Sequence, residues 1–414
     1  MKKILLFAIV LCLGFQLYGD IPPRYVELGL DADIGAANNY IGLMDVFTPD
    51  RKITIDLDML PVNSGFSLNM NAEAKPFFLN IQTRGKHEVG FGLYVGVEAA
   101  VYSNLPGDVM RLLSKGNAGL SSFSGDIAAG ASVFADVGLE AHARFGKLKI
   151  GLSPAVYIPV VYTPKPSIRF MVDTGETIKG EAAIDASVYT PISLEDLLGD
   201  SPDSSGSFTL DPWAILEARG FDFSLNAEYE VLPVLDAGGL VKHIPLMPAV
   251  LNHKMNASTA YSFNPDGSQG ILDMLDDDFN FDDMFTIEEL TMSYSDDASL
   301  RVFRPMTFDF YARYKPLSTN AIVLKPNIGF SVLTIYEKAG FNFGLECELN
   351  WKNFVSLAVR TGYWERLWQH RVAIMLLNLR ALEVNVGVGL QSQDFVSSFK
   401  ISGANVAVGI RLGF

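Results

Sequence analysis

Apolar side chains occupy every second position along much of this 414-residue chain. In the longest clean case, from Val133 to Phe145, seven apolar residues alternate with a mostly polar set that includes Asp136, Glu140 and Arg144. Successive side chains of a strand point to opposite faces, so this period of two predicts strands with one apolar and one polar face. Clear alternation also occurs at 26–34, 89–98, 221–231, 306–314, 341–349, 355–359 and 382–390.

The last nine residues alternate in the same way and end on an aromatic side chain. Five apolar residues share one face of this terminal strand: Val406, Val408, Ile410, Leu412 and Phe414. An unpaired apolar strand in a soluble protein invites aggregation. An outer-membrane barrel avoids this problem because its last strand closes the cylinder against the first. The five residues are therefore expected to form the barrel-closing signal, with the barrel-assembly machinery as a partner.

The first 19 residues predict a signal peptide. Lys2 and Lys3 precede an apolar stretch from Ile4 to Phe15, and Leu17-Tyr18-Gly19 is an expected cleavage site. About a dozen apolar residues are too few for a helix that spans roughly 30 Å of hydrocarbon. We expect export, removal of 1–19, and a bacterial outer-membrane location for residues 20–414, with outer-membrane lipid around them.

Composition agrees with a barrel. Mean hydropathy is positive, at +0.21, yet no uninterrupted apolar run after residue 20 approaches 18 residues, so transmembrane helices are not expected. Hydrophobicity that is spread as alternation is typical of strands spanning lipid. The predicted fold class is all-β, an antiparallel transmembrane barrel. A two-sheet sandwich, which would also alternate, is the alternative.

Net charge and cysteine content exclude one class of partner and two kinds of site. Loss of residues 1–19 removes two lysines and no acids, which moves the formal net charge from −15 to −17. So acidic a chain is not expected to bind nucleic acid. Only Cys347 remains after cleavage, which excludes an internal disulfide and a cysteine metal cluster.

Short turns and long polar connections alternate along the chain, as expected for the periplasmic and outer ends of a barrel. Gly107–Lys115 has apolar residues at helical spacing and predicts a short amphipathic helix. Trp351 and Trp364 flank one strand and are expected either in an aromatic girdle or in packing. Residues 232–253 are expected to form either a periplasmic loop or a constriction within the lumen. The predicted outer loops are 103–125, 191–220, 264–305 and 392–404.

Three C-terminal segments carry a family resemblance: Phe354–Arg360, Asn378–Glu383 and Val406–Phe414. With them, residues 300–414 resemble the spirochaete branch of the long-chain fatty-acid transporter (FadL-like) outer-membrane family. The resemblance implies about 14 strands, in a range of 12–16, an N-terminal plug at 36–60, and passive uptake of hydrophobic molecules. Typical members carry an Asn-Pro-Ala element in the plug, whereas this chain has Asn38-Asn39-Tyr40.

Four arginines lie on the polar, lumen-side parity of their strands and are the predicted ligand-binding residues: Arg144, Arg313, Arg360 and Arg411. A guanidinium stays charged and pairs bidentately with a carboxylate, as a fatty acid would require. The same parity carries many acids, among them Glu228, Glu346 and Glu383. The alternative is that the arginines pair with these acids and stiffen the barrel.

The sequence gives little support for an active site or a metal site. The chain has no H-E-x-x-H or G-x-S-x-G sequence and no histidine pair at metal-ligand spacing. His142 is the one candidate for an acid–histidine dyad and is expected to make a lumen hydrogen bond. Asp276–Asp283 invites a calcium interpretation, but Phe281 stands where a calcium loop needs glycine. We expect no catalytic residue, no metal and no cofactor.

These patterns favour an outer-membrane barrel for passive uptake of long-chain fatty acids or other hydrophobic small molecules. One alternative is a water-filled, cation-preferring porin, because the polar face is strongly acidic. Another is a surface-exposed interaction or adhesion protein, because the connection at 264–305 is long.

Overall fold

The structure is a computed structural model that describes most of the chain. The described residues are 25–40, 42, 62–63, 65–83, 88–115, 122–164, 166–174, 178–193, 212–263, 285–287, 291–317, 319–332, 339–351, 355–364, 366–378, 381–399 and 402–413. The predicted signal peptide at 1–19, nearly all of the predicted plug at 36–60, the acidic stretch 276–283 and Phe414 lie outside them.

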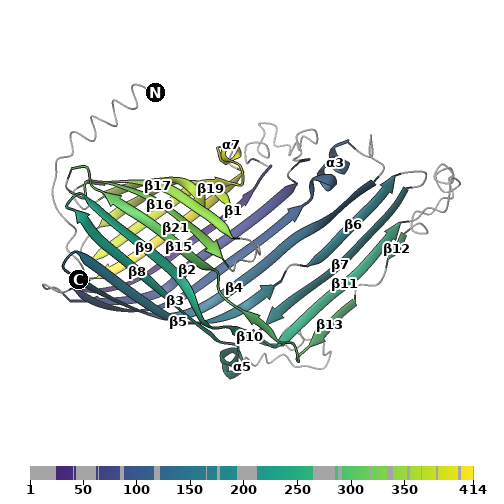
Figure 1. Cartoon of the computed structure of the whole chain (residues 1–414), viewed down its shortest axis with the longest axis horizontal. Coiled ribbons are helices and arrows are strands. Elements are labelled where there is room, and N and C mark those ends of the chain that lie inside the picture. The colour runs from purple at the N-terminus through teal and green to yellow at the C-terminus, as the bar shows by residue number, and fades with distance from the viewer. Residues whose placement is uncertain are drawn as a thin grey trace.

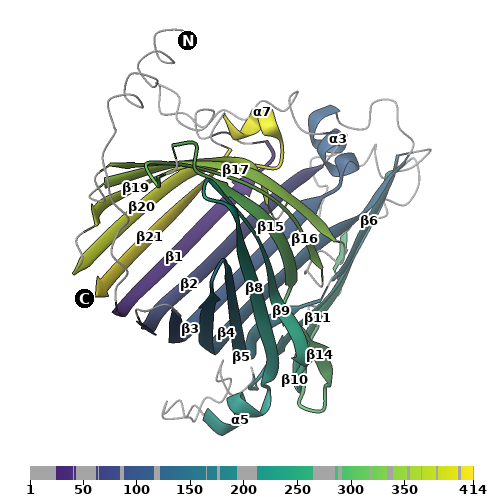
Figure 2. The same cartoon turned by 60° about the vertical axis from the view of Figure 1, so that its left-hand side comes forward.

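A closed ring of antiparallel strands forms the body of the molecule (Figures 1 and 2). The first strand, β1 (Val26–Asn38), pairs on one side with β2 (Phe66–Gln82) and on the other with the last strand, β21 (Gly403–Gly413). This closure confirms the predicted all-β antiparallel barrel. From β2 to β21 the ring passes through β3 (Val89–Leu105), β4 (Ser122–Phe145), β5 (Leu148–Thr163), β8 (Gly220–Leu232), β9 (Leu235–Met247), β15 (Met306–Tyr314), β16 (Ile322–Val332), β17 (Gly340–Trp351), β18 (Val355–Trp364), β19 (Leu367–Asn378) and β20 (Leu382–Ser392).

The two faces of each ring strand differ in polarity as the alternation predicts. On β4, Leu139 is exposed on the outside of the barrel, whereas Asp136 is buried on the lumen side. On β21, Val406 is exposed and Asn405 is buried. Apolar side chains that face outward without a protein neighbour match a barrel surrounded by hydrocarbon. The polar faces together line the lumen.

The two ends of the ring have different connections. Turns of two residues join β4 to β5 and β8 to β9, and the C-terminus lies at this same end (Figure 1). The helices α3 (Gly107–Lys115) and α7 (Phe395–Ser398) lie together at the other end (Figure 2). α3 occupies the residues whose spacing predicts a helix. Among the described residues, no helix is long and apolar enough to cross a membrane.

A sheet extension continues one side of the barrel beyond the ring. It consists of β6 (Ser167–Thr174), β7 (Ile178–Thr190), β11 (His253–Phe263), β12 (Phe285–Ile287) and β13 (Thr291–Ser295). The start of β4 pairs with β6, and β6 is followed in space by β7 and β11, with β12 and β13 both on the far side of β11. β5 and β6 both pair antiparallel with β4, so they are two segments of one strand interrupted near Pro164 and Pro166.

The extension meets the ring at a small buried core around Tyr157. A two-stranded sheet lies there, formed by β10 (Ala249–Leu251) and β14 (Leu300–Val302), together with the short helix α5 (Pro212–Glu217) earlier in the chain. Tyr157 is 1% exposed, and its hydroxyl lies 3.0 Å from the Val302 carbonyl oxygen, to which it donates. The hydroxyl oxygen of Tyr157 also accepts from the Ala249 N–H at 3.4 Å. One hydroxyl therefore joins both strands of the small sheet to the barrel wall. Buried residues around it are Phe134, Ala218, Ala249, Leu251 and Val302.

Tyr157→Phe should lower the free energy of unfolding by about 1–2 kcal/mol, because a buried carbonyl and a buried N–H both lose their partner. The measurement is the thermal unfolding midpoint of the barrel in detergent. Tyr229→Phe is the matched control, since Tyr229 is 49% exposed. Equal midpoints for the two variants would show that the hydroxyl does not hold the small sheet.

Candidate functional site in the barrel lumen

Strand β9 bulges into the lumen at Lys242 and His243. The register of β8 against β9 shifts here: Phe223 pairs with Ile244, and Leu225 pairs with Val241. Ser224 alone therefore stands opposite two residues, and its hydroxyl accepts the His243 N–H at 3.1 Å. His243 has a φ of 56°, a left-handed conformation uncommon for a residue with a side chain. Bulges of this kind re-aim side chains and recur beside functional sites.

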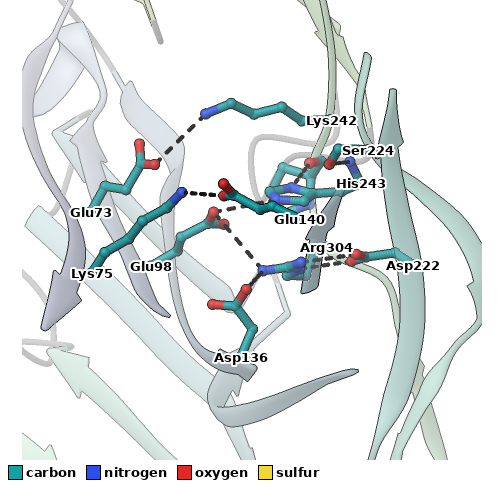
Figure 3. Close-up of polar contacts among 11 residues, drawn as sticks. Glu73, Lys75, Glu98, Asp136, Glu140, Asp222, Ser224, Lys242, His243 and Arg304 are labelled. Carbon is teal, nitrogen blue, oxygen red and sulfur yellow. Dashed lines mark hydrogen bonds and ion pairs between the residues drawn. The ribbon is translucent and has the colours of Figure 1, made fainter. Parts of the chain in front are cut away.

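The two bulged residues contact acidic side chains across the lumen (Figure 3). Lys242 Nζ lies 3.7 Å from a carboxylate oxygen of Glu73 on β2. His243 Nε2 lies 3.4 Å from Glu98 on β3, and its Nδ1 donates to the Pro305 carbonyl at 2.9 Å. In the ring, β4, β5 and β8 separate β3 from β9. These contacts therefore span the lumen and do not merely follow the wall.

Arg304 lies beneath the bulge and is the most buried charge of the cluster. It is 2% exposed and donates twice to Asp222 on β8, with Nε–Oδ2 and Nη2–Oδ1 distances of 2.7 and 2.9 Å. Its Nη1 lies 3.0 Å from Asp136 on β4 and 4.0 Å from Glu98. The planar guanidinium suits this bidentate contact with Asp222, and its Nη1 remains available to the other two acids. Arg304 thus connects three barrel strands to the segment that enters β15 (Figure 3).

We name this cluster the lumenal constriction: Glu73, Glu98, Asp136, Asp222, Lys242, His243 and Arg304. Lys75 adds a further pair to Glu140, at 3.2 Å, from β2 to β4. Two cavities of about 230 and 170 Å³ are both lined by Glu73, Glu98, Lys242 and His243. Apolar side chains share these walls with the charged ones, among them Leu225 and Leu240 in the first cavity and Phe134 in the second. Chemically, the constriction can hold the two sides of the barrel together and obstruct the lumen.

The four predicted arginines lie on the lumen side but at separate places. Arg144 lies 3.6 Å from Glu88, and Arg313 lies 3.6 Å from Glu228. Arg411 lies 3.3 Å from Asp31 and 3.6 Å from Glu383. For these three, the alternative of structural pairing with acids matches the geometry. Arg360 differs, because its guanidinium lies 3.7 Å from the ring centre of Trp364.

Two sequence-based interpretations need correction. Trp364 shares the lumen parity of Arg360 and lies against Gly344 and Gly362, so it is not part of an outward girdle. Residues 232–253 do not form a periplasmic loop, because β8 and β9 are joined by a two-residue turn at Pro233. The segment instead matches the alternative expectation, because its residues Lys242 and His243 constrict the lumen.

Sequence reasoning missed Arg304 and did not select Lys242 or His243 as site residues. Arg304 falls within 264–305, which the sequence assigns to an outer loop, yet it is buried in the lumen. Its only local signal is the short apolar Leu300-Arg-Val302 that precedes it. Among the described residues, no group of three or more His, Cys, Asp or Glu could hold a metal ion. The acidic stretch 276–283 lies outside those residues.

No protein-family profile matches the chain, and no curated protein is similar to it. Several solved proteins are similar in structure at low identity. The toluene transporter TodX of P. putida has a TM-score of 0.47 and 9% identity, over 95% of this chain and 91% of that one. The toluene transporter TbuX of Ralstonia pickettii has a TM-score of 0.39 and 8% identity, over 95% and 90%. A Pseudomonas aeruginosa FadL homologue has a TM-score of 0.40 and 8% identity, over 94% and 90%. Likeness at this level assigns neither a family nor a substrate.

Proposed function

We propose that the protein is an outer-membrane barrel for passive uptake of hydrophobic small molecules such as long-chain fatty acids, and that the lumenal constriction keeps it closed to bulk ions. The observation that carries the proposal is the pair of contacts from the β9 bulge to acids of the opposite wall. Lys242 reaches Glu73, and His243 reaches Glu98. An open aqueous pore would leave such charges facing water on their own walls.

Other features support the membrane setting. The outward side chains of the ring are apolar and exposed, including Phe91, Leu139 and Val406, which suits lipid. The proposed functional barrel is the fourteen-strand ring β1–β5, β8, β9 and β15–β21, with residues 36–60 as its plug. The hydrophobic class of solute comes from the resemblance at 354–360, 378–383 and 406–414. Residues 1–19 would direct export and then be removed, and we infer no enzymatic activity.

Two alternatives keep specific support. The lumen holds more acids than bases at the constriction, where Glu73, Glu98, Asp136 and Asp222 face Lys242, His243 and Arg304. An acidic lumen would favour cations if the barrel opened. The sheet extension, which projects beyond the ring (Figure 1), supports a surface-interaction role.

The test combines two measurements on the purified mature protein. In a planar bilayer, we expect inserted barrels without stable conductance steps. In liposomes that contain the protein, we expect faster entry of a long-chain fatty acid than in empty liposomes. Large cation-selective steps would favour the porin alternative. A silent barrel that does not speed entry of fatty acid or of a neutral alkane would leave surface interaction as the better proposal.

A further inference from the structure

Helix α7 packs on the outward face of the barrel wall, at the end of the ring away from the C-terminus (Figure 2). Its aromatic side chains contact Trp368 and His370 of β19. These two residues share the parity of Val372, which is exposed on the outside of the ring. The opposite parity carries Arg371, whose Nη1 lies 2.6 Å from Asp33 in the lumen. The side chains that α7 contacts therefore belong to the face that lipid would cover.

Two aromatic contacts and one polar contact hold α7 against this face. The rings of Phe395 and Trp368 form a T-shaped pair with centres 4.8 Å apart. The ring of Phe399 stacks on His370 at 4.3 Å. His370 Nε2 also lies 2.9 Å from the hydroxyl oxygen of Ser398, which is fully buried. Close aromatic pairs stabilise beyond the area that they bury, so this short helix has a defined place on the wall.

An aromatic band runs along the same face beside α7. It lies near one end of five neighbouring strands, β15 to β19, and this is the end that carries α7. Girdles of aromatic side chains mark the boundary between the hydrocarbon and the headgroups. The helix therefore lies at the depth where the outer interface is expected. The rings of the band contact one another in two groups, Phe308 with Phe330, and Phe341, Phe343, Tyr363 and Trp368.

The helix and its C-terminal neighbour add exposed apolar side chains to this band. Phe395 is 45% exposed, Val396 64% and Phe399 57%. The surface they form is continuous with the outward wall, because both phenylalanines lie against Trp368 or His370. A short helix with such a face at the level of the headgroups buries it at the boundary of the acyl chains. Continuity with the wall identifies lipid as the occupant.

We propose that α7 is an interfacial anchor, and that Phe395, Val396 and Phe399 enter the outer leaflet at the boundary between acyl chains and headgroups. The sequence assigns 392–404 to an outer loop, whereas the proposal places the helix of that loop in the membrane. Because α7 joins β20 to β21, the anchor acts on the hairpin that closes the barrel against β1. The inference rests on the proposed membrane setting and is independent of the solute.

The test measures how deeply position 396 lies in a bilayer. The full mature chain carries Cys347→Ala and Val396→Cys, and a small fluorophore is attached to the new cysteine in nanodiscs. The ring pairs that hold α7 use Phe395 and Phe399, so a label at position 396 leaves them intact. We expect a nitroxide near the top of the lipid acyl chains to quench most of the fluorescence, and iodide in the water to quench little.

Two matched sites calibrate the depth. Leu139→Cys places the label on the outward wall of β4, where Leu139 is exposed. Ser293→Cys places it on β13 of the sheet extension, where Ser293 is also exposed. We expect a nitroxide deep in the acyl chains to quench the label at position 139, and iodide alone to quench the label at position 293.

The outcomes separate the anchor from the membrane setting. If iodide quenches the label at position 396 as strongly as that at 293, while the deep nitroxide still quenches that at 139, α7 lies in water and the anchor proposal is wrong. If neither quencher reaches position 396, another protein or a second copy of the chain covers the helix, which also overturns the proposal. If iodide alone quenches all three labels, the membrane setting itself fails. Phe399→Cys is the second labelling site should Val396→Cys not fold.

Discussion

Arg304→Met is expected to lower the free energy of unfolding more than any other single substitution considered for this barrel. It removes the cation that contacts Asp222, Asp136 and Glu98, of which Asp222 and Asp136 are buried. Breaking a buried pair by removing one partner typically costs about 3–5 kcal/mol, because the remaining charge is left without compensation. The midpoint of thermal unfolding in detergent should fall sharply, and the barrel should unfold at a lower temperature during gel electrophoresis.

A compensated variant separates loss of charge balance from loss of packing. Arg304→Met combined with Asp222→Asn and Asp136→Asn removes the cation and two of its acids together. Replacement of a buried ion cluster by hydrophobic residues of similar volume is often neutral or stabilising, and the two asparagines likewise leave no uncompensated charge at positions 136 and 222. We therefore expect the triple variant to recover much of the stability that the single variant loses. A triple variant as unstable as Arg304→Met would mean that the size and shape of the arginine matter more than its charge.

The barrel could be predicted from the sequence because its pattern is local. Alternation such as that of Val133 to Phe145 requires only a strand with lipid on one side and a polar lumen on the other. The same parity correctly places Arg144, Arg313, Arg360 and Arg411 on the lumen side. The parity of a residue, however, predicts only which face of the sheet its side chain lies on and not which side chain it contacts. Whether Arg411 meets Asp31 or a solute depends on how β1 lies against β21, which is a contact between the two ends of the chain.

The constriction could not be predicted for two physical reasons. The bulge at Lys242 and His243 places one extra residue in β9, so the alternation with a period of two fails where the site begins. Arg304 follows a three-residue strand, β14, that is too short to show any period. Its partners come from β3, β4 and β8, and nothing in the sequence near residue 304 specifies them. Trp364 differs, because its parity with Arg360 already places it on the lumen side, and only its packing against Gly344 of β17 depends on the tertiary structure.

Opening the constriction should turn a silent barrel into a conducting one. Lys242→Ser with His243→Gly removes both bulged side chains that reach the opposite wall, and glycine accepts the left-handed φ of 56° at position 243. Glu73 and Glu98 would then face the lumen without these partners. We expect stable single-channel steps in a planar bilayer, with a preference for cations because the exposed side chains are acidic.

Lys325→Ser is the control for this prediction, because it also removes one lumen lysine. Lys325 contacts Glu346 and Glu348 on the neighbouring strand β17, so its ion pairs follow the wall and do not cross the lumen. The control should stay silent. If the double variant is also silent, the closure must come from elsewhere in the chain, with residues 36–60 the first segment to delete. If both variants conduct, loss of a single lumen lysine is enough to open the barrel. Conductance then depends on the total charge of the lumen and not on the contacts that cross it.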